Sequence, residues 1–177
     1  MELLAPAGDL EKLATVYAFG ADAAYIGLAG FSLRRRANDV DPASVADRLR
    51  DIKGTKRLYG ALNIYFHDAD LARLERDIDA IAALPLDAII VSDLGALPLL
   101  RRRLDHVELH LSTQANCLNT EAARIYHDLG FTRIIAAREM SLDDLAALKA
   151  GLPELEVEAF VHGAMCLAYS GRCLLSA

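Results

Sequence analysis

The chain has 177 residues, enough for one domain with a sizeable core. Hydrophobic residues make up 54% and charged residues 25%, which excludes a disordered chain. The formal net charge of −6 excludes a global positive field that would attract nucleic acid, and three unevenly placed cysteines exclude a disulfide framework. Neither a signal-peptide pattern nor an apolar run approaching the roughly 20 residues of a membrane span is found. We therefore expect a protein of the reducing cytoplasm.

In chain order, short apolar runs alternate with amphipathic segments. The apolar runs predict strands at 2–5, 23–26, 57–64, 88–91, 107–111, 133–136 and 156–161. Helices are predicted at 9–19, 41–52, 70–84, in the segment that ends at 103, and at 121–129 and 141–150. Capping residues support several of these helix starts, notably Asp9, Pro42, and Ser141 with Asp144 three residues on. The strict alternation predicts parallel strands with right-handed crossovers.

A doubly wound open sheet and a (β/α)8 barrel both fit this alternation. A period of about 20 to 35 residues favours the barrel, and no glycine-rich dinucleotide-binding turn follows the first strand. Polar residues also recur after the strands, where a barrel builds its active site: Asn63, Ser92, Asp93, Ser112, Gln114, Arg138, Glu139 and His162. We predict an α/β, TIM-like barrel that is incomplete, with about seven βα units where eight would close it.

The strand-end residues have a structural and a functional interpretation. Ser112, Thr113, Gln114 and Asn116 either cap helices and bond their loop, or orient a small polar substrate. Arg138 and Glu139 either form an ion pair across neighbouring strands, or Arg138 binds a carboxylate through its bidentate fork. We predict that Asn63, Asp93, Gln114, Arg138 and His162 converge on one pocket, and we name these five with Glu139 as candidate catalytic residues. The chain has two arginine runs. Arg34–Arg36 is a candidate for binding RNA phosphates, whereas Arg101–Arg103 is interpreted as a solvated helix terminus.

The last twenty residues hold two of the three cysteines, Cys166 and Cys173. Soft ligands crowded with glycines and small residues just after a strand suggest a metal or cluster site. Three other interpretations stay open on the residues alone. The cysteines are small buried hydrophobes, or Cys166 is a nucleophile paired with His162, or His162 joins both cysteines in a zinc site that lacks an obvious fourth ligand.

Seven motifs occur in order along the chain: ELLAPAGDLEKL, GADAAYIGL, LNIYFHD, AIIVSDLGAL, HLSTQANCLN, AAREMSL and FVHGAMCLAYSGRCLLS. Over essentially the whole chain these motifs resemble peptidase family U32, the collagenase-like proteases. The resemblance implies an N-terminal barrel and an oxygen-independent hydroxylase that acts on a tRNA wobble uridine, ribosomal RNA or a ubiquinone precursor, with prephenate implicated as oxygen donor. The family name implies a peptidase as the alternative.

The same resemblance implies a 4Fe–4S cluster on four cysteines, of which Cys166 and Cys173 are two; the others are expected after position 177. Cys117 is not one of the family's cluster positions. Residues 1–177 are therefore expected to be the N-terminal barrel domain of a U32-type protein, truncated before the remaining cluster cysteines and inactive by itself. The expected partner is RNA or a small-molecule substrate and not a membrane, and the oligomeric state is left open.

Overall fold

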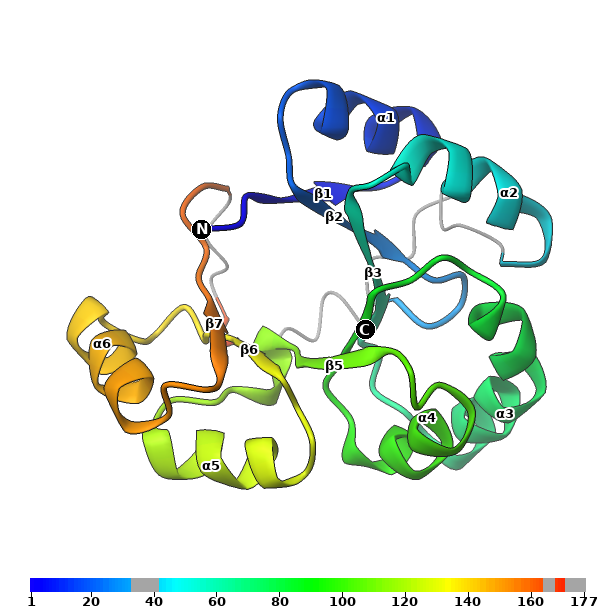
Figure 1. The fold of residues 1–177 in the computed structure, drawn as a ribbon. Helices are drawn as coiled ribbons and strands as arrows, with labels where there is room; N and C mark the ends of the chain where they lie inside the picture. Colours follow the sequence, from blue (N-terminus) through cyan, green and yellow to red (C-terminus); the bar gives the residue numbers. More distant parts are fainter. Residues whose placement is uncertain (33–41, 164–167, 171–177) are drawn as a thin grey trace.

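The computed structural model describes residues 1–32, 42–163 and 168–170. Seven strands form one sheet in the order β1-β2-β3-β4-β5-β6-β7, and every neighbouring pair is parallel. The sheet curls into a half-barrel with the helices on its outside (Figure 1). The predicted α/β, TIM-like and incomplete barrel is confirmed.

The strands are β1 (Leu4–Ala7), β2 (Ala23–Gly27), β3 (Arg57–Leu62), β4 (Ala88–Val91), β5 (Glu108–Leu111), β6 (Arg133–Ile135) and β7 (Glu156–Glu158). The helices are α1 (Leu10–Ala18), α2 (Pro42–Lys53), α3 (Asp68–Ala82), α4 (Leu97–Arg103), α5 (Thr120–Asp128) and α6 (Leu142–Gly151). Short 3-10 turns, η1 (Leu94–Ala96) and η2 (Thr113–Ala115), follow β4 and β5. No helix in the described ranges is long and apolar enough to cross a bilayer.

Several predicted boundaries were wrong, and three of them have a clear physical reason. Strand β1 runs through Pro6, which was expected to lie beyond it; β1 is an edge strand, and an edge strand tolerates proline. Strand β7 stops at Glu158 instead of position 161, because its neighbour β6 offers only three residues for pairing. Helix α3 begins at Asp68 because His67 and Asp70 form a capping box ahead of the predicted start.

The two faces of the sheet have different roles. The outer face packs under the helices into the main core, to which every helix contributes a buried apolar side chain: Leu13, Leu49, Leu74, Leu100, Ala123 and Leu148. Burying one large side chain of this kind stabilises the fold by about 1.5–3 kcal/mol. The inner face carries a smaller apolar cluster of Ala23, Tyr59, Ala88, Ile90 and Ile135. Polar groups on the inner face are therefore held between strands and not between the strands and the helices.

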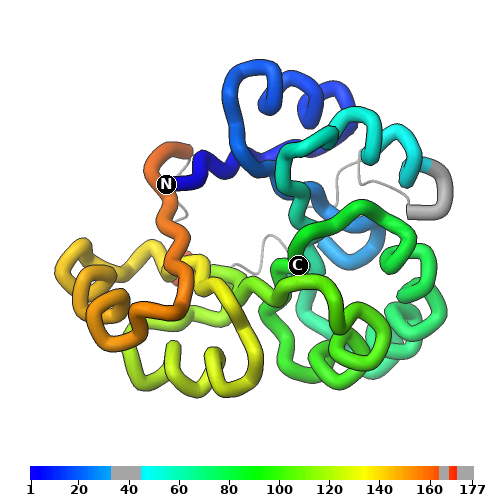
Figure 2. The backbone as a smooth tube through the Cα atoms, in the orientation of Figure 1, coloured from blue at the N-terminus to red at the C-terminus, as the bar shows by residue number. Residues whose placement is uncertain are grey.

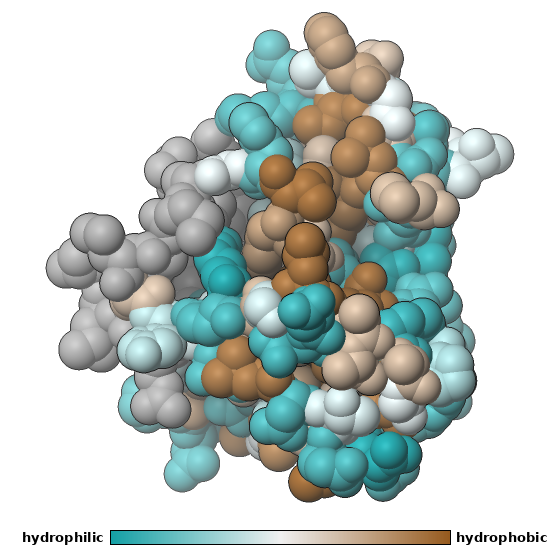
Figure 3. Space-filling view, turned by 90° about the vertical axis from the view of Figure 1, so that its left-hand side faces the viewer, coloured by the Kyte–Doolittle hydropathy of each residue, from teal (hydrophilic) through white to brown (hydrophobic). Residues whose placement is uncertain are grey.

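The edge strands β1 and β7 leave a seam, and the N-terminus lies beside the segment that follows β7 (Figure 2). The space-filling view of this side shows apolar side chains gathered among hydrophilic ones (Figure 3). The exposed large apolar residues next to β1 and β7 include Leu3, Phe160 and Val161. The seam is therefore more apolar than a fully solvated edge. Inside the half-barrel, the charged cluster described below joins the segment before β1 to β6 and β7.

Candidate active site

The carboxyl ends of the seven parallel strands lie at one end of the half-barrel, here called the mouth. Five of the candidate residues follow strand ends and belong to this end: Asn63 after β3, Asp93 after β4, Gln114 after β5, Arg138 after β6 and His162 after β7. Glu139 lies there too. The structure therefore places all six at the same end of the sheet. Their convergence on a single pocket stays a prediction.

Several mouth residues hold the backbone of their own turns. The Asp93 carboxylate accepts a hydrogen bond from the Gly95 N–H at 2.7 Å and caps η1. The Ser112 hydroxyl accepts from the Gln114 N–H at 3.3 Å and caps η2, and it lies 3.4 Å from the Gln114 side-chain oxygen. The capping interpretation thus describes Ser112, and Asp93 has the same role at η1, while the half-buried amide of Gln114 keeps further hydrogen-bonding capacity.

Asn116 differs from these capping residues. It adopts the left-handed conformation with a φ of 54°, and its Oδ1 is buried with no hydrogen-bond partner in the described part of the chain. A buried acceptor without a partner costs about 1–3 kcal/mol, so this oxygen is a candidate contact for a ligand or a water molecule. Asn63 is half-buried and donates its backbone N–H to the Phe31 carbonyl at 2.9 Å, whereas His162 is exposed.

Ser170 connects the segment after β7 to the ends of β5 and β6. Its buried hydroxyl accepts from the Arg138 N–H at 3.2 Å and lies 3.4 Å from the Thr113 hydroxyl, and its own N–H donates to Glu139 Oε1 at 2.8 Å. Thr113 also donates to the Ala136 carbonyl at 3.1 Å. Burial acts to raise the pKa of Glu139, but the hydrogen bonds from the backbone and hydroxyl of Ser170 and from the Glu139 N–H, with the charge of Arg138, together hold this pKa below its ordinary value. The mouth loops are thereby joined through one small residue.

The contacts of Ser170 with the mouth bear on the candidate cysteine ligands. Ser170 lies between Cys166 and Cys173 in the sequence, so the point at which the chain is bonded to the mouth falls between the two candidate ligands. Cys166 and Cys173 themselves lie outside the described residues, as does Arg34–Arg36. Cys117 is buried in the core, with its thiol 3.8 Å from the Asn119 carbonyl. Among the residues that the structure describes, no group of three metal-ligating side chains comes together.

Arg138 and Glu139 make separate contacts. The Arg138 guanidinium lies 4.2 Å from the centre of the Phe160 ring, a cation–π arrangement, while Glu139 accepts from Ser170. Within the described ranges the two side chains do not form an ion pair with each other, and Arg138 has no carboxylate partner. The interpretation of Arg138 as a carboxylate-binding residue therefore stays open, with its side chain held by the aromatic ring.

A second group of polar residues lines the inside of the half-barrel below the mouth, and the sequence analysis missed it. This floor cluster consists of Glu2, Arg57, Tyr59, Glu108, His110, Arg133, Glu156 and Glu158. Six of them occupy alternate positions of β3, β5 and β7. Polar residues at alternate positions of a strand were the available signal, because such residues share one face of the sheet.

Arg133 is the centre of the floor cluster, with its side chain only 7% exposed. Its guanidinium contacts Glu156 at 2.5 and 2.7 Å, Glu2 at 2.7 Å and Glu158 at 3.5 Å, and lies 5.3 Å from the centre of the Tyr59 ring. The Tyr59 hydroxyl donates to both Glu2 oxygens at 2.9 Å. Burial alone would raise the pKa of Glu2, but Arg133 and Tyr59 together hold it below the ordinary value.

His110 lies on the inner face with no exposed surface. Its Nε2 is 3.4 Å from Glu108 and its ring packs edge-on against Tyr59, but Nδ1 has no partner among the described residues. Burial, helped by Arg133 and Arg57, lowers the pKa of His110 to about 3. The imidazole is therefore neutral at physiological pH, and within the described residues only one of its two ring nitrogens has a partner.

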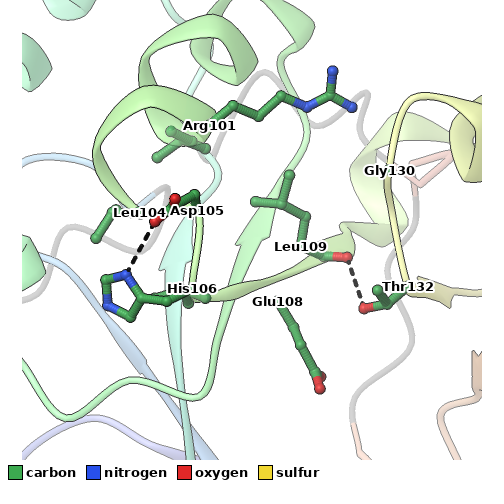
Figure 4. Close-up of a pocket in the computed structure, with 10 residues that line it drawn as sticks. Arg101, Leu104, Asp105, His106, Glu108, Leu109, Gly130 and Thr132 are labelled. Carbon is green, nitrogen blue, oxygen red and sulfur yellow. Dashed lines mark hydrogen bonds and ion pairs between the residues drawn. The ribbon is translucent and has the colours of Figure 1, made fainter.

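A hollow of about 330 Å3 lies at the opposite end from the mouth, beside the amino ends of β5 and β6 (Figure 4). Apolar side chains from α4 and β5 line it, together with Arg101, whose guanidinium approaches Gly130. His106 faces Asp105 across 3.6 Å at its edge, and both are exposed. Because the hollow lacks the strand-end polar residues, it is a groove between α4 and the turn before β6 and not the predicted mouth pocket.

The fold and the polar mouth place the chain among TIM-like α/β barrel proteins, whose active sites lie at the carboxyl ends of the strands. The chain is similar in fold to the solved structure of a U32 peptidase, with a TM-score of 0.69 and 15% identity over 90% of this chain and 67% of that one. The chain belongs to peptidase family U32, whose model matches residues 8–177.

Curated relatives are similar along the whole chain. A tRNA hydroxylation protein P from Helicobacter pylori is 43% identical over all of this chain and 42% of its own length. A 23S rRNA 5-hydroxycytidine synthase from Escherichia coli is 38% identical over 99% of this chain and 26% of its own length. A collagenase from Porphyromonas gingivalis is 35% identical over 99% of this chain and 44% of its own length. The chain thus spans less than half the length of these relatives.

Proposed function

We propose that this chain is the N-terminal barrel region of an oxygen-independent RNA hydroxylase of family U32. Its substrate is a pyrimidine of RNA, either the wobble uridine of tRNA or a base of ribosomal RNA. Relatives named for tRNA and rRNA hydroxylation support this class of substrate. An RNA substrate in turn favours a cytoplasmic location.

The observation that carries the proposal is the attachment of Ser170 to the mouth. It links the segment between Cys166 and Cys173 to the strand ends where barrel enzymes act. We assign these two thiols to a 4Fe–4S cluster, whose usual four thiolates would be completed by residues beyond those described. Such a cluster supplies electron transfer when bound. The mouth residues Asn63, Asp93 and Gln114 would orient the base, because amide and carboxylate groups match the donors and acceptors of a pyrimidine.

Arg138 has a distinct role in this proposal. Its guanidinium is fixed over Phe160 and has no carboxylate partner among the described residues, which suits recognition of a carboxylate on the oxygen donor. Prephenate, with two carboxylates, fits this requirement. Glu139 acts through Ser170, since its carboxylate holds the N–H of that residue and so positions the cysteine-bearing segment. His162 is exposed at the mouth and is assigned to contact with the substrate.

Complementation with the longer protein tests the proposal. Cells that lack the gene receive the wild type, Cys166→Ala, Cys173→Ala or the matched control Cys117→Ala, and hydroxylated pyrimidine nucleosides in tRNA and rRNA are measured by mass spectrometry. We expect the product with the wild type and Cys117→Ala and its loss with the other two, in parallel with loss of cluster absorbance in anaerobically purified protein. Hydroxylation that survives in Cys166→Ala and Cys173→Ala would contradict the assignment.

A peptidase is the alternative function, and similarity to the Porphyromonas gingivalis collagenase favours it. The same anaerobic preparation is therefore incubated with gelatin and denatured collagen. Cleavage by the wild type that is lost in Cys166→Ala, together with unmodified RNA in the complementation, would establish the peptidase and reject the hydroxylase.

A further inference from the structure

The floor cluster contains more carboxylates than cations. Glu2, Glu108, Glu156 and Glu158 face the inside of the half-barrel, opposed by Arg57 and Arg133. The only imidazole of the cluster, His110, is fully buried and neutral. Four like charges against two opposite ones in a partly buried space are unfavourable, so the cluster lowers its energy by keeping one carboxyl protonated.

The contacts identify which carboxyl this is. Glu156 meets two nitrogens of Arg133, at 2.5 and 2.7 Å, and its side chain is 54% exposed. Glu2 meets Arg133 at 2.7 Å and also accepts from Tyr59. The Glu158 carboxylate contacts only Arg133, at 3.5 Å, among the residues that the structure describes, and it is the least exposed of the three at 17%. Its charged form thus has the weakest support from cations and from water.

We propose that Glu158 holds a proton at neutral pH inside the half-barrel and transfers it to an oxygen of the ligand that enters through the mouth. This inference rests on the proposed function and deepens it, because the ligand is the pyrimidine of an RNA, whose ring carbonyl oxygen accepts the proton. Glu158 is the last residue of β7, so among the floor-cluster residues of that strand it is the one at the mouth end.

The proposed step transfers one proton from Glu158 to the ligand. The O–H bond of the Glu158 carboxyl breaks, an O–H bond forms on the ligand oxygen, and the carboxylate left behind is stabilised by Arg133 at 3.5 Å. A proton from solvent restores the carboxyl through the exposed part of its side chain. No electrons move in this step, so it needs no further reactant.

Glu158 shares the floor cluster with charged and titratable groups from the segment before β1 and from β3, β5, β6 and β7. They are Glu2 before β1, Arg57 and Tyr59 on β3, Glu108 and His110 on β5, Arg133 on β6 and Glu156 on β7. Burial outweighs the opposing effect of Arg133 and raises the pKa of Glu158 to about 7. Burial also raises the pKa of Tyr59, which keeps its proton and so does not compete.

Direct titration tests where the proton lies. The longer protein is labelled with 13C at glutamate side-chain carboxyls, and the signals are followed by NMR between about pH 4 and pH 9; the signal missing from Glu158→Gln assigns the residue. We expect a midpoint near 7 for Glu158, whereas a midpoint below about 5 would overturn the inference. This readout does not depend on hydroxylation, so it decides the protonation even if the proposed function fails.

Activity measurements test the transfer. Glu158→Gln keeps the size and neutrality of the protonated carboxyl but cannot give up a proton, so we expect a thermal midpoint like that of the wild type and a hydroxylation rate lowered on the order of 10²–10⁴-fold. Because the carboxyl must be protonated, the wild-type rate is expected to fall as the pH rises through neutrality, and this fall is expected to persist in Glu158→Asp. Glu154→Gln, an exposed glutamate outside the cluster, is the matched control. A wild-type rate and pH profile in Glu158→Gln would overturn the transfer role.

Discussion

Replacing Arg133 with methionine tests the electrostatic account of the floor cluster. Methionine keeps a long apolar stem but removes the guanidinium that contacts Glu2, Glu156 and Glu158 and covers Tyr59. With the Arg133 side chain 7% exposed, water does not replace what is lost. Removing one partner of a buried ion pair costs about 3–5 kcal/mol, because the remaining charges are uncompensated. We expect the free energy of unfolding at neutral pH to fall by about this amount.

The pH dependence of this loss gives a second check. The pKa of Glu2 is lowered in the wild type, so the stability it contributes is present above its unfolded pKa and is lost as the pH falls through its folded pKa. In Arg133→Met the stranded carboxylates take up protons instead, so the deficit relative to the wild type is expected to shrink at about pH 4.

Urea unfolding at both pH values measures the two effects, provided that the slope with denaturant is unchanged. Arg57→Met is the matched control, since this arginine is 35% exposed and its pair with Glu108 is worth only about 0–1 kcal/mol. If Arg133→Met loses less than about 1 kcal/mol of unfolding free energy at neutral pH, or loses the same amount at both pH values, then Arg133 does not stabilise the cluster electrostatically.

Three further outcomes are expected. Tyr59→Phe removes the hydroxyl that donates to Glu2 and is expected to lower stability by about 1 kcal/mol, measured by urea unfolding. Gly130→Ala places a Cβ 2.7 Å from the Arg101 guanidinium at a φ of +85°, so we expect a loss of about 1–3 kcal/mol, and an unchanged thermal midpoint would contradict it. Because the folded-state pKa of Glu158 is raised from 4.5 to about 7, its stabilising contribution is expected to be lost as the pH rises through that window, and Glu158→Gln is expected to remove this dependence in unfolding measured against pH.

The architecture could be predicted because its signal is local and repeated. Alternating strands and helices leave few topologies, and the capping residues Asp9 and Ser141 mark their helices as expected. The strand ends were less predictable, because pairing sets them. Strand β7 stops where β6 stops, although its own sequence continues to alternate, and β1 includes Pro6 because one of its edges is unpaired.

The site was only partly predictable for a related reason. The mouth residues follow from strand order, since parallel strands bring their carboxyl ends together. The role of Ser170 depends on partners 31 to 57 residues away, and no local pattern indicates them. The alternation of Glu156 and Glu158 in β7 was a sequence signal for the floor cluster. Charged residues in a short strand also look like ordinary solvated positions, however, until the curvature of the sheet is known.

The pairing of Glu2 with Arg133 bears on the order in which the fold assembles. These residues are 131 positions apart, so their contact forms only after β6 has been synthesised and has joined the sheet. Before that point the partners available to the Glu2 carboxylate are on β3, where Tyr59 donates a hydrogen bond and Arg57 forms an ion pair. Contacts of such long sequence separation are closed late and slowly, because the chain entropy must be lost before they form. The half-barrel is thus an assembly in which the segment before β1 depends on β6, and the charges on its inside are balanced only after β6 and β7 have joined the sheet.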